Sequence, residues 1–292
     1  MLVRSQCRLV LIVVVAVALG LGPVSCARKG DAVSSQSKPT GRIERLRVSG
    51  SGTALPLLRL LTDSYSRVVP GGDVSFVYLP GLHSGGGVKG VVAGDLEIGA
   101  VSRELTKDER GLHLRYVLLS NDGLAIAVHP SVGVRGVTTQ QVREIYSGRF
   151  ANWKELGGAD LPITVLDRNE DESAKIILRK YVLGSDLDVT PRAVDLYYES
   201  DMIEGLQTTP GAIGYFSLGY GLSQNVSVDY LTLDGVAPTV ANIESGAYRV
   251  VRPLGVVART DASDGADRFL AWASGVEAAA LMERVGFVPA RR

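Results

Sequence analysis

Apolar and polar positions alternate along this chain with two periods, one typical of strands and one typical of helices. A short apolar run at 46–49 is followed by an amphipathic stretch at 55–67, and a run at 74–79 precedes another at 87–93. Pro56 suits the first turn of the 55–67 helix, because that turn leaves its amide groups unpaired anyway. Strands that alternate with helices in this way predict an α/β fold with largely parallel sheets.

The same alternation continues through the rest of the chain. We expect further strands at 95–101, 114–119, 123–128, 163–166, 212–216, 230–234 and 250–258. We expect further helices at 139–146, 173–182, 198–206 and 264–284, and a turn at 108–111. The sequence shows no internal repeat.

The N-terminal segment has the pattern of an export signal. Arg4 and Arg8 precede an apolar run at 9–21, which is shorter than the about 20 residues that a membrane helix needs. We therefore expect an exported chain that works in the periplasm or at the outer face of the cell membrane.

The end of this signal resembles that of a bacterial lipoprotein, in which the cysteine becomes the lipidated first residue. Val24-Ser25-Cys26 fits the pattern, whereas Pro23 stands where leucine is usual. We expect a signal peptide at 1–26, a lipid anchor on the membrane at Cys26 and a flexible polar tether at 27–42. A plain secretory signal with an incidental cysteine is the alternative interpretation.

The charge balance narrows the choice of partner. The 292 residues include 31 Lys and Arg and 31 Asp and Glu, so the formal net charge is +0. Binding to the phosphate backbone of nucleic acid needs a clear basic excess, which this chain lacks. Any anion site must therefore be built from local loops and one or two arginines rather than from a general positive field.

Cysteine and histidine are too sparse to suggest a metal site. The two cysteines, Cys7 and Cys26, lie in or at the end of the expected signal, so the mature domain has no disulfide. The three histidines, His83, His113 and His129, are widely spaced, and isolated histidines are more often surface or capping residues. We expect no metal and no cofactor.

Two loops of glycine and hydroxyl residues carry the strongest chemical signal. The segment 49–56 reads Ser-Gly-Ser-Gly-Thr-Ala-Leu-Pro and the segment 83–89 reads His-Ser-Gly-Gly-Gly-Val-Lys; each lies between an expected strand and an expected helix. The start of a helix exposes unpaired amide groups at the positive end of its dipole, and serine and threonine add hydroxyl donors. A single such loop is often only a helix cap, but two in one chain favour an oxyanion site.

Sequence blocks from about residue 46 to 289 resemble, in order, the phosphate-binding receptor of bacterial phosphate ABC transporters. The first is Ser51-Gly52-Thr53-Ala54-Leu55-Pro56-Leu57, and the second is Ser84-Gly85-Gly86-Gly87. The others lie at 95–105, 122–130, 145–148, 152–158, 209–215 and 252–254. The resemblance covers essentially the whole expected mature chain.

This resemblance implies a two-lobed periplasmic-binding-protein fold of type II, hinged by two crossing strands near 124–128 and 249–256. Residues 43–125 and 252–292 would form domain I, and residues 129–248 would form domain II. The implied function is a receptor, not an enzyme, that captures phosphate or a related tetrahedral oxyanion in the cleft between the domains. It would act as a monomer and deliver the anion to the transmembrane subunits of an ABC permease.

The resemblance also implies which residues contact the anion. The matching positions are Ser51, Thr53 and the backbone of Ala54 and Leu55 in the first loop, Ser84 in the second, Ser102 in the third, and Arg168. Some relatives carry aspartate in place of Ser102. Arginine suits the last position because its planar fork can hold two oxygens of one tetrahedral anion; an interdomain salt bridge is the alternative role for Arg168.

The chain departs from the family just after this arginine, at a fourth loop whose candidate contacts to the anion are Glu172 and Ser173. Relatives usually show Ser-Gly-Thr where Glu172, Ser173 and Ala174 stand here, and the segment 170–172 adds three carboxylates. Two like charges ~4 Å apart repel by about 4 kcal/mol at an effective dielectric constant near 20. Either these carboxylates point away, or Glu172 or its neighbour Asp171 accepts a proton of the ligand, or the ligand is not phosphate.

Two other functions stay open at this point. The altered loop favours a non-transport paralogue that acts as a sensor or scaffold in the cell envelope and binds phosphate weakly or not at all. An exported hydrolase with a serine nucleophile has little support, because the sequence has neither a G-x-S-x-G motif nor an evident Ser–His–Asp set.

Overall fold

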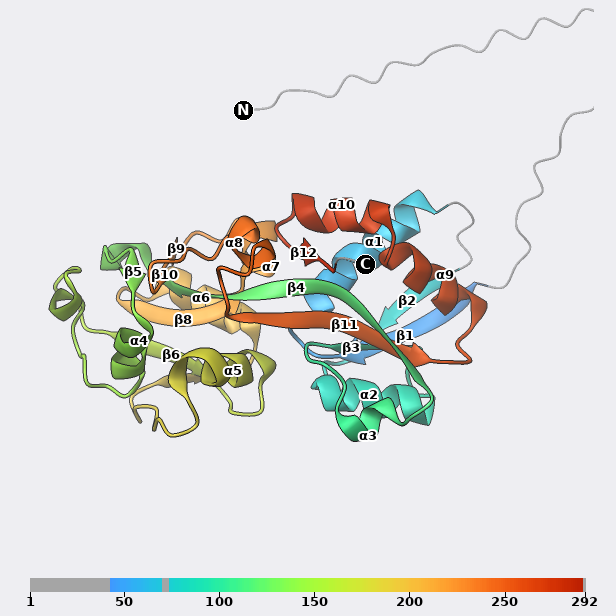
Figure 1. Ribbon diagram of the computed structural model, residues 1–292, viewed down its shortest axis with the longest axis horizontal. Coiled ribbons are helices and arrows are strands. Elements are labelled where there is room, and N and C mark those ends of the chain that lie inside the picture. The colour runs from blue at the N-terminus through green and yellow to red at the C-terminus, as the bar shows by residue number, and fades with distance from the viewer. Residues whose placement is uncertain (1–42, 70–73, 291–292) are drawn as a thin grey trace, which may run out of the picture. The chain divides into compact units, whose positions relative to one another are not determined.

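The computed structural model describes residues 43–69 and 74–290 (Figure 1). The expected signal peptide at 1–26, the lipidation site Cys26 and the tether at 27–42 lie outside this part of the chain. Within the described ranges, no helix combines the length and the apolar character that crossing a membrane requires.

Three parallel strands open the fold. β1 (Glu44–Gly50) lies between β2 (Val74–Tyr78) and β3 (Ile98–Val101), and both pairings are parallel. Helix α1 (Leu55–Val68) leads from β1 to β2, and α2 (Ser84–Ala93) leads from β2 to β3. The order strand–helix–strand thus repeats as the hydrophobic pattern predicts.

Two longer strands adjoin this sheet and run antiparallel to each other (Figure 1). They are β4 (Leu114–Val128) and β11 (Val251–Arg259), and β11 also pairs with β3. The sequence predicts two strands at 114–119 and 123–128. The structure has one, because the residues between them stay extended and pair with β11 and with β12 (Val288–Pro289).

The far half of β4 begins a second group of strands. The order there is β4-β8-β6-β7, with β8 (Ala212–Ser217) antiparallel to β4, and β6 (Thr164–Arg168) parallel to both β8 and β7 (Val194–Leu196). Its helices are α4 (Thr139–Tyr146), α5 (Ser173–Leu178), a π-helical turn (Arg179–Leu183) that continues α5, and α6 (Glu199–Thr208).

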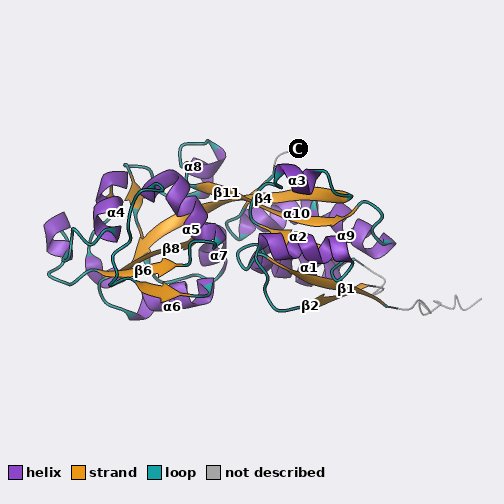
Figure 2. Cartoon of the chain, turned by 90° about the horizontal axis from the view of Figure 1, so that it is seen from below, coloured by secondary structure: helices purple, strands orange, loops and turns teal. Residues whose placement is uncertain are grey.

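The described part of the chain contains further elements (Figure 2). They are α3 (Lys107–Arg110), 3-10 turns (Pro130–Val132 and Trp153–Leu156), β5 (Gly136–Val137), α7 (Leu218–Ser223), β9 (Asp229–Tyr230), β10 (Thr232–Leu233), α8 (Val240–Glu244), α9 (Asp264–Ala273) and α10 (Val276–Arg284). In Figure 1, α1, α9 and α10 lie on one face of the sheet that contains β1, and α2 and α3 lie on the other.

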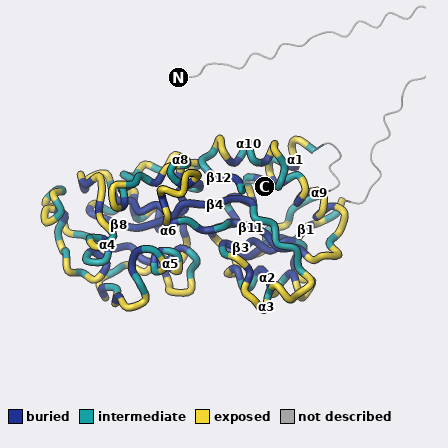
Figure 3. Tube along the Cα trace, viewed as in Figure 1, coloured by how far each residue is buried: buried dark blue, intermediate teal, exposed yellow. Residues whose placement is uncertain are grey.

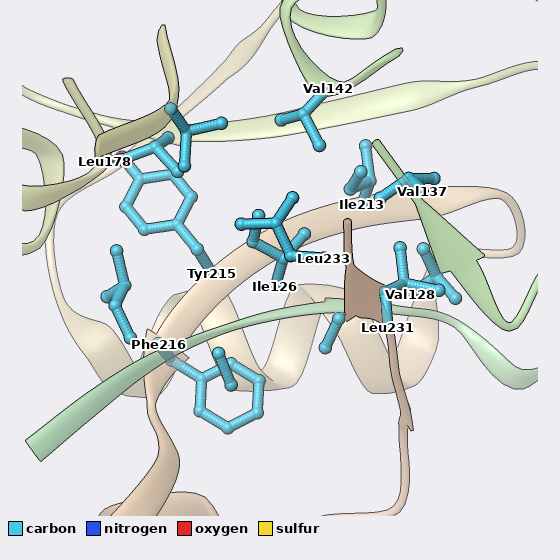
Figure 4. Close-up of a cluster of buried hydrophobic side chains, with 14 of the residues drawn as sticks. Ile126, Val128, Val137, Val142, Leu178, Ile213, Tyr215, Phe216, Leu231 and Leu233 are labelled. Carbon is cyan, nitrogen blue, oxygen red and sulfur yellow. The ribbon is translucent and has the colours of Figure 1, made fainter. Parts of the chain in front are cut away.

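Buried apolar side chains gather in separate clusters along these elements. The largest cluster draws its residues from 124–250 and Val288 (Figure 4), and the next draws from 46–119 and 254–287. Strand β4, which is buried along much of its length in Figure 3, contributes to both clusters. Leu124 belongs to the largest cluster and Leu119 belongs to the next. β4 therefore ties the two cores together through its backbone.

The expected α/β class is confirmed, with two differences in detail. Sheets are parallel at β2-β1-β3 and β8-β6-β7 but antiparallel where β4 and β11 join them, so the expectation of largely parallel sheets holds only away from these strands. The single helix predicted at 264–284 is two helices, because the chain leaves the helix at Ser274 and Gly275.

Candidate functional site

The turn between β1 and α1 places Ser51 directly after the carboxyl end of β1. Gly50 adopts a φ of +132°, and a Cβ there would lie 2.2 Å from the carbonyl oxygen of Ala100 on β3. Only glycine allows this approach, and the Ser51 amide then donates to the same carbonyl at 2.9 Å. The turn is thereby fixed against the end of β3.

Serines from separate loops meet at this point. The Ser102 hydroxyl lies 2.6 Å from the Ser51 hydroxyl and 3.3 Å from the Ser84 hydroxyl, and the Ser102 amide donates to Ser84 Oγ at 3.1 Å. A fourth serine, Ser173 at the first turn of α5, donates from Oγ to the Ser102 carbonyl oxygen at 3.3 Å. We call Ser51, Ser84, Ser102 and Ser173 the serine cluster.

The serine cluster faces a cavity of about 120 Å³. The cavity is lined by Ser51, Gly52, His83, Ser84, Gly85, Ser102, Arg103, Asp171, Glu172, Ser173, Ile176 and Ile177. The first turns of α2 and α5 and the turn before α1 contribute to its wall, and the first amides of a helix have no partner within the helix. Hydroxyl groups and helix starts together make an environment suited to an anion.

The three carboxylates of the altered loop lie in different environments. Glu170 turns to Arg179, whose Nη2 lies 2.5 Å from Glu170 Oε1, and this hydrogen bond lowers the pKa of the Glu170 carboxyl. Glu172 Oε1 lies 3.6 Å from Nδ1 of His83, and Asp171 Oδ2 lies 3.7 Å from Nε2 of the same ring. Two of the three carboxylates therefore line the cavity, and His83 is close to both.

Arg103 is the other basic side chain at this cavity, and an acid already holds it. Its guanidinium donates to both carboxylate oxygens of Glu109, at 2.7 and 2.8 Å. These bonds lower the pKa of Glu109 to about 2 and raise the pKa of Arg103. Arg103 is thus fixed by α3 at the edge of the serine cluster.

Arg168 lies beside this cavity rather than in its wall. It is 5% exposed, and its Nη2 donates to the Tyr197 carbonyl oxygen at 3.0 Å and lies 3.1 Å from Glu172 Oε2. This pair joins neighbouring residues, so it is not the interdomain salt bridge considered as an alternative. Nε and Nη1 are buried with no hydrogen-bond partner among the described residues. Arg168 lines a second cavity, whose volume is about 200 Å³.

Three of the positions implied for the first loop do not line the cavity of the serine cluster. The amides of Ala54 and Leu55 both donate to the Ser51 carbonyl oxygen at 3.0 Å, so they are engaged within the turn. Thr53 is 3% exposed, and within the described ranges neither it nor the other two lines the 120 Å³ cavity. Their role in binding stays a prediction.

His83 is the site residue that sequence reasoning missed. Its wide separation from the other two histidines hides its role, although it directly precedes Ser84 in one of the two glycine and serine loops. Both of its ring nitrogens lie near carboxylates, and no hydrogen bond joins them to a serine hydroxyl among residues 43–69 and 74–290. This geometry does not support a serine nucleophile activated by histidine.

The part of the chain that the structure describes contains no group of three or more His, Cys, Asp or Glu side chains arranged to hold a metal ion. The site offers hydroxyl groups, helix starts and charged side chains, which are the means of binding an anion through hydrogen bonds.

Comparisons with known proteins agree with this chemistry. The family model described as "PBP superfamily domain" matches residues 33–276. The curated "Phosphate-binding protein PstS" of Bacillus subtilis is 28% identical over 240 residues, which cover 81% of this chain and 76% of that protein. The protein of the same name from Borreliella burgdorferi is 24% identical over 249 residues, covering 82% and 88%.

Solved structures give the same picture. A substrate-binding protein of an ABC transporter with bound phosphate, from Clostridium perfringens, is 26% identical and superposes with a TM-score of 0.75, covering 85% of this chain and 100% of that one. An ABC-type phosphate transport receptor from Vibrio cholerae is 26% identical, with a TM-score of 0.63 and coverage of 84% and 99%.

Proposed function

Because this chain belongs to the PBP superfamily, we propose that it is an exported receptor that captures phosphate, or a related tetrahedral oxyanion, and delivers it to an ABC permease. The serine cluster is the observation that carries the proposal. Loops far apart in the sequence place the Ser51 and Ser84 hydroxyls 2.6 and 3.3 Å from the Ser102 hydroxyl, at a cavity of about 120 Å³. The phosphate-binding names of the relatives supply the ligand class.

We further propose that the anion lies between two lobes, formed by residues 43–125 with 252–292 and by residues 129–248. The separate hydrophobic clusters support this division, and β4 and β11 would be the hinge. Ser102 and Ser173 would then come from opposite lobes, so that the bound anion joins them. Closure of two lobes over a ligand is the usual motion of hinged receptors.

The anchor and the assembly state are parts of the same proposal. A lipid at Cys26 and the tether at 27–42 would keep the receptor at the membrane surface, where the permease subunits are. We expect it to act there as a monomer. A sensor or scaffold remains the second candidate function, because Asp171 and Glu172 line the proposed anion cavity.

Titration calorimetry tests the proposed function. The purified protein should bind inorganic phosphate, and Ser102→Ala should weaken binding about tenfold or more, because a hydrogen bond to a charged group contributes roughly 1.5–3 kcal/mol. Ser66→Ala is the matched control, since that hydroxyl donates to the Thr62 carbonyl oxygen of α1 at 2.8 Å, in a helix interior.

Each outcome has a clear meaning. Absence of phosphate binding would favour the sensor or scaffold. Wild-type affinity in Ser102→Ala would remove the serine cluster from the site. Thr53→Ala decides the extent of the site: a loss equal to that of Ser102→Ala supports the first loop implied by the resemblance, and unchanged affinity confines the site to the serines.

A further inference from the structure

His83 lies between two carboxylates at the wall of the serine-cluster cavity. It directly precedes α2 and lines both this cavity and the second one. Its Nε2 lies 3.7 Å from Asp171 Oδ2, and its Nδ1 lies 3.6 Å from Glu172 Oε1. A protonated ring carries an N–H group on both nitrogens, whereas a neutral ring carries only one and turns a lone pair towards one of the carboxylates. This arrangement therefore suits the protonated form of the ring.

The other charged side chains in the wall of the serine-cluster cavity do not favour an anion. They are Arg103 and the two carboxylates, Asp171 and Glu172. Glu109 donates no proton here but accepts two hydrogen bonds from the Arg103 guanidinium, at 2.7 and 2.8 Å, and so offsets its charge. With a neutral His83 ring, the wall has one positive and two negative side chains. Protonation of the ring brings the formal charge of the wall to zero.

The second cavity supplies no cation that could replace this histidine. Its further titratable side chains are Arg168, Tyr197, Tyr198, Glu199 and Tyr220. Arg168 lies 3.1 Å from Glu172 Oε2, whereas His83 faces Oε1 of the same carboxylate. Glu199 lies 3.5 Å from Arg252. Among all these residue types, histidine is the one that ordinarily changes its charge between about pH 5 and 8.

We propose that His83 is the pH-dependent cationic contact of the anion site, and that the oxyanion binds more tightly as the pH falls from about 8 to about 6. The protonated ring neutralises the carboxylates of the altered loop, which would otherwise repel the ligand. His83 belongs to residues 43–125, whereas Asp171 and Glu172 belong to residues 129–248, so the ring also joins the two proposed lobes beside the ligand. The inference rests on the proposed anion site and names the residue that regulates it.

Calorimetric titration with inorganic phosphate tests this role in His83→Gln and His83→Lys. The side chain is 52% exposed, so neither change leaves a cavity in a hydrophobic core. Phosphate itself changes charge with pH, so the affinities of wild type and variant are compared as a ratio at each pH. We expect His83→Gln to bind about tenfold more weakly than wild type near pH 5.5, the value of one hydrogen bond to a charged group, and this difference should shrink towards pH 8.5. His83→Lys keeps its charge, so it should bind more tightly than wild type near pH 8.5.

Proton uptake separates this titration from a merely structural role. If the protonated ring favours the bound anion, then binding of the anion must favour protonation of the ring, because such coupling is reciprocal. Calorimetry near pH 7 in buffers of different ionisation enthalpy counts these protons. The wild type should take up a larger fraction of a proton for each phosphate than His83→Gln or His83→Lys. His113→Gln is the matched control and should behave as wild type, because His113 is exposed and lines neither cavity.

The contrary results are distinct. If the wild type binds phosphate while its affinity ratio to His83→Gln and its proton uptake relative to that variant show no effect of pH, the inference is wrong and the phosphate receptor stands. Equal losses of affinity in His83→Lys and His83→Gln would show that position 83 does not act through its charge. If the wild type binds no phosphate at any pH, the proposed function fails and the inference fails with it.

Discussion

Glu172 departs from the serine that the family resemblance implies at this position, and its place in the structure bears on selectivity. Its side chain is 13% exposed, whereas that of Asp171 is 72% exposed. Its carboxylate lies 3.1 Å from Arg168, which offsets part of its charge, and 3.6 Å from the His83 ring. Of the two carboxylates that line the serine-cluster cavity, Glu172 is thus the better placed to accept a proton carried by the ligand.

We expect this carboxylate to select phosphate and arsenate over sulfate. Monohydrogen phosphate can donate its proton to Glu172, whereas sulfate has no proton near neutral pH and would meet only repulsion. A buried group left without its partner discriminates by up to about 10⁴-fold. Competition calorimetry should show that the wild type binds phosphate but not sulfate. In Glu172→Gln, the ratio of phosphate affinity to sulfate affinity should be smaller.

Asp171→Asn is the control, because it removes a neighbouring carboxylate that is mainly in solvent. If Asp171→Asn, rather than Glu172→Gln, reduces the preference for phosphate over sulfate, then Asp171 is the proton acceptor. Sulfate binding equal to that of phosphate in the wild type would refute a proton acceptor at this loop.

At the residue scale, the sequence could indicate the serines but not the charges around them. Ser51, Ser84 and Ser102 follow strands whose ends meet, so their proximity can be expected from the alternation of strands and helices. His83 and the partners of Glu170 depend on side-chain directions across loops, which sequence spacing does not determine. The second cavity could not be predicted for the same reason, since two of its lining residues, Arg168 and Glu199, are 31 positions apart in the chain.

At the scale of elements, a regular hydrophobic period predicts the bounds of a helix well, whereas an irregular pattern does not. Helix α4 begins and ends at the expected residues, because Thr138 and Gln141 form a capping box before a regular apolar face. Helix α2 begins at Ser84 rather than at residue 87, since three glycines conceal the first turn from an apolar pattern. The turn expected at 108–111 is the short helix α3, which needs its cap to form.

We expect α3 to contribute a pH-dependent share of stability through Glu109. The Arg103 guanidinium depresses the pKa of this carboxyl to about 2. Because the pKa of Glu109 is lower in the folded than in the unfolded state, the ionised carboxylate stabilises the fold at pH values above the unfolded-state pKa. This stabilisation is lost as the pH falls from the unfolded-state pKa towards 2. Glu109→Gln should therefore lower the free energy of unfolding at pH 7 by about 1–2 kcal/mol, after allowance for solvent screening of a partly exposed pair.

Denaturant unfolding at pH 7 and pH 3 measures this effect. Glutamine keeps the capping box with Thr106, so the loss reports the charge and not the cap. Glu155→Gln is the matched control, because Glu155 caps the 3-10 turn at Trp153 by accepting from the amides of Ala151 and Asn152, with no salt bridge among the described residues. Equal losses in the two variants, or a Glu109→Gln loss that persists undiminished at pH 3, would contradict the assignment.

At the scale of the whole described region, β4 and β11 carry the connection between the two cores. The resemblance implied a hinge of two crossing strands, and the family match and the solved relatives confirm the two-lobed periplasmic-binding-protein fold. Composition and periodicity could establish only the α/β class. The antiparallel pairing of β4 with β11 links segments 130 positions apart, as between Asp122 and Arg252, and no local pattern signals it.

A buried ion pair sits where these strands meet. Arg252 and Asp122 are 0% and 1% exposed, with Arg252 Nη2 3.1 Å from Asp122 Oδ2, and Glu199 Oε1 lies 3.5 Å from the same Nη2. Asp122 Oδ1 accepts from Ser217 Oγ at 2.9 Å and from the Gly219 amide at 3.2 Å. Burial raises the pKa of Asp122, and Arg252 opposes that shift. The carboxylate thus ties β4 to β11 and to the start of α7.

We expect Asp122→Ala to destabilise both cores together. The change leaves the buried Arg252 charge with Glu199 as its one remaining ion-pair partner among the described residues. Breaking a buried pair by removing one partner costs roughly 3–5 kcal/mol. Because β4 passes through both hydrophobic clusters, unfolding should remain a single transition at a lower denaturant midpoint, whether followed by far-ultraviolet circular dichroism or by tryptophan fluorescence. Asp261→Ala, which removes the exposed partner of Arg259 at the end of β11, should leave the midpoint nearly unchanged. Two separate transitions in Asp122→Ala would show that the cores unfold independently and that β4 does not couple them. A midpoint as high as that of Asp261→Ala would show that the buried pair contributes little to the stability of the fold.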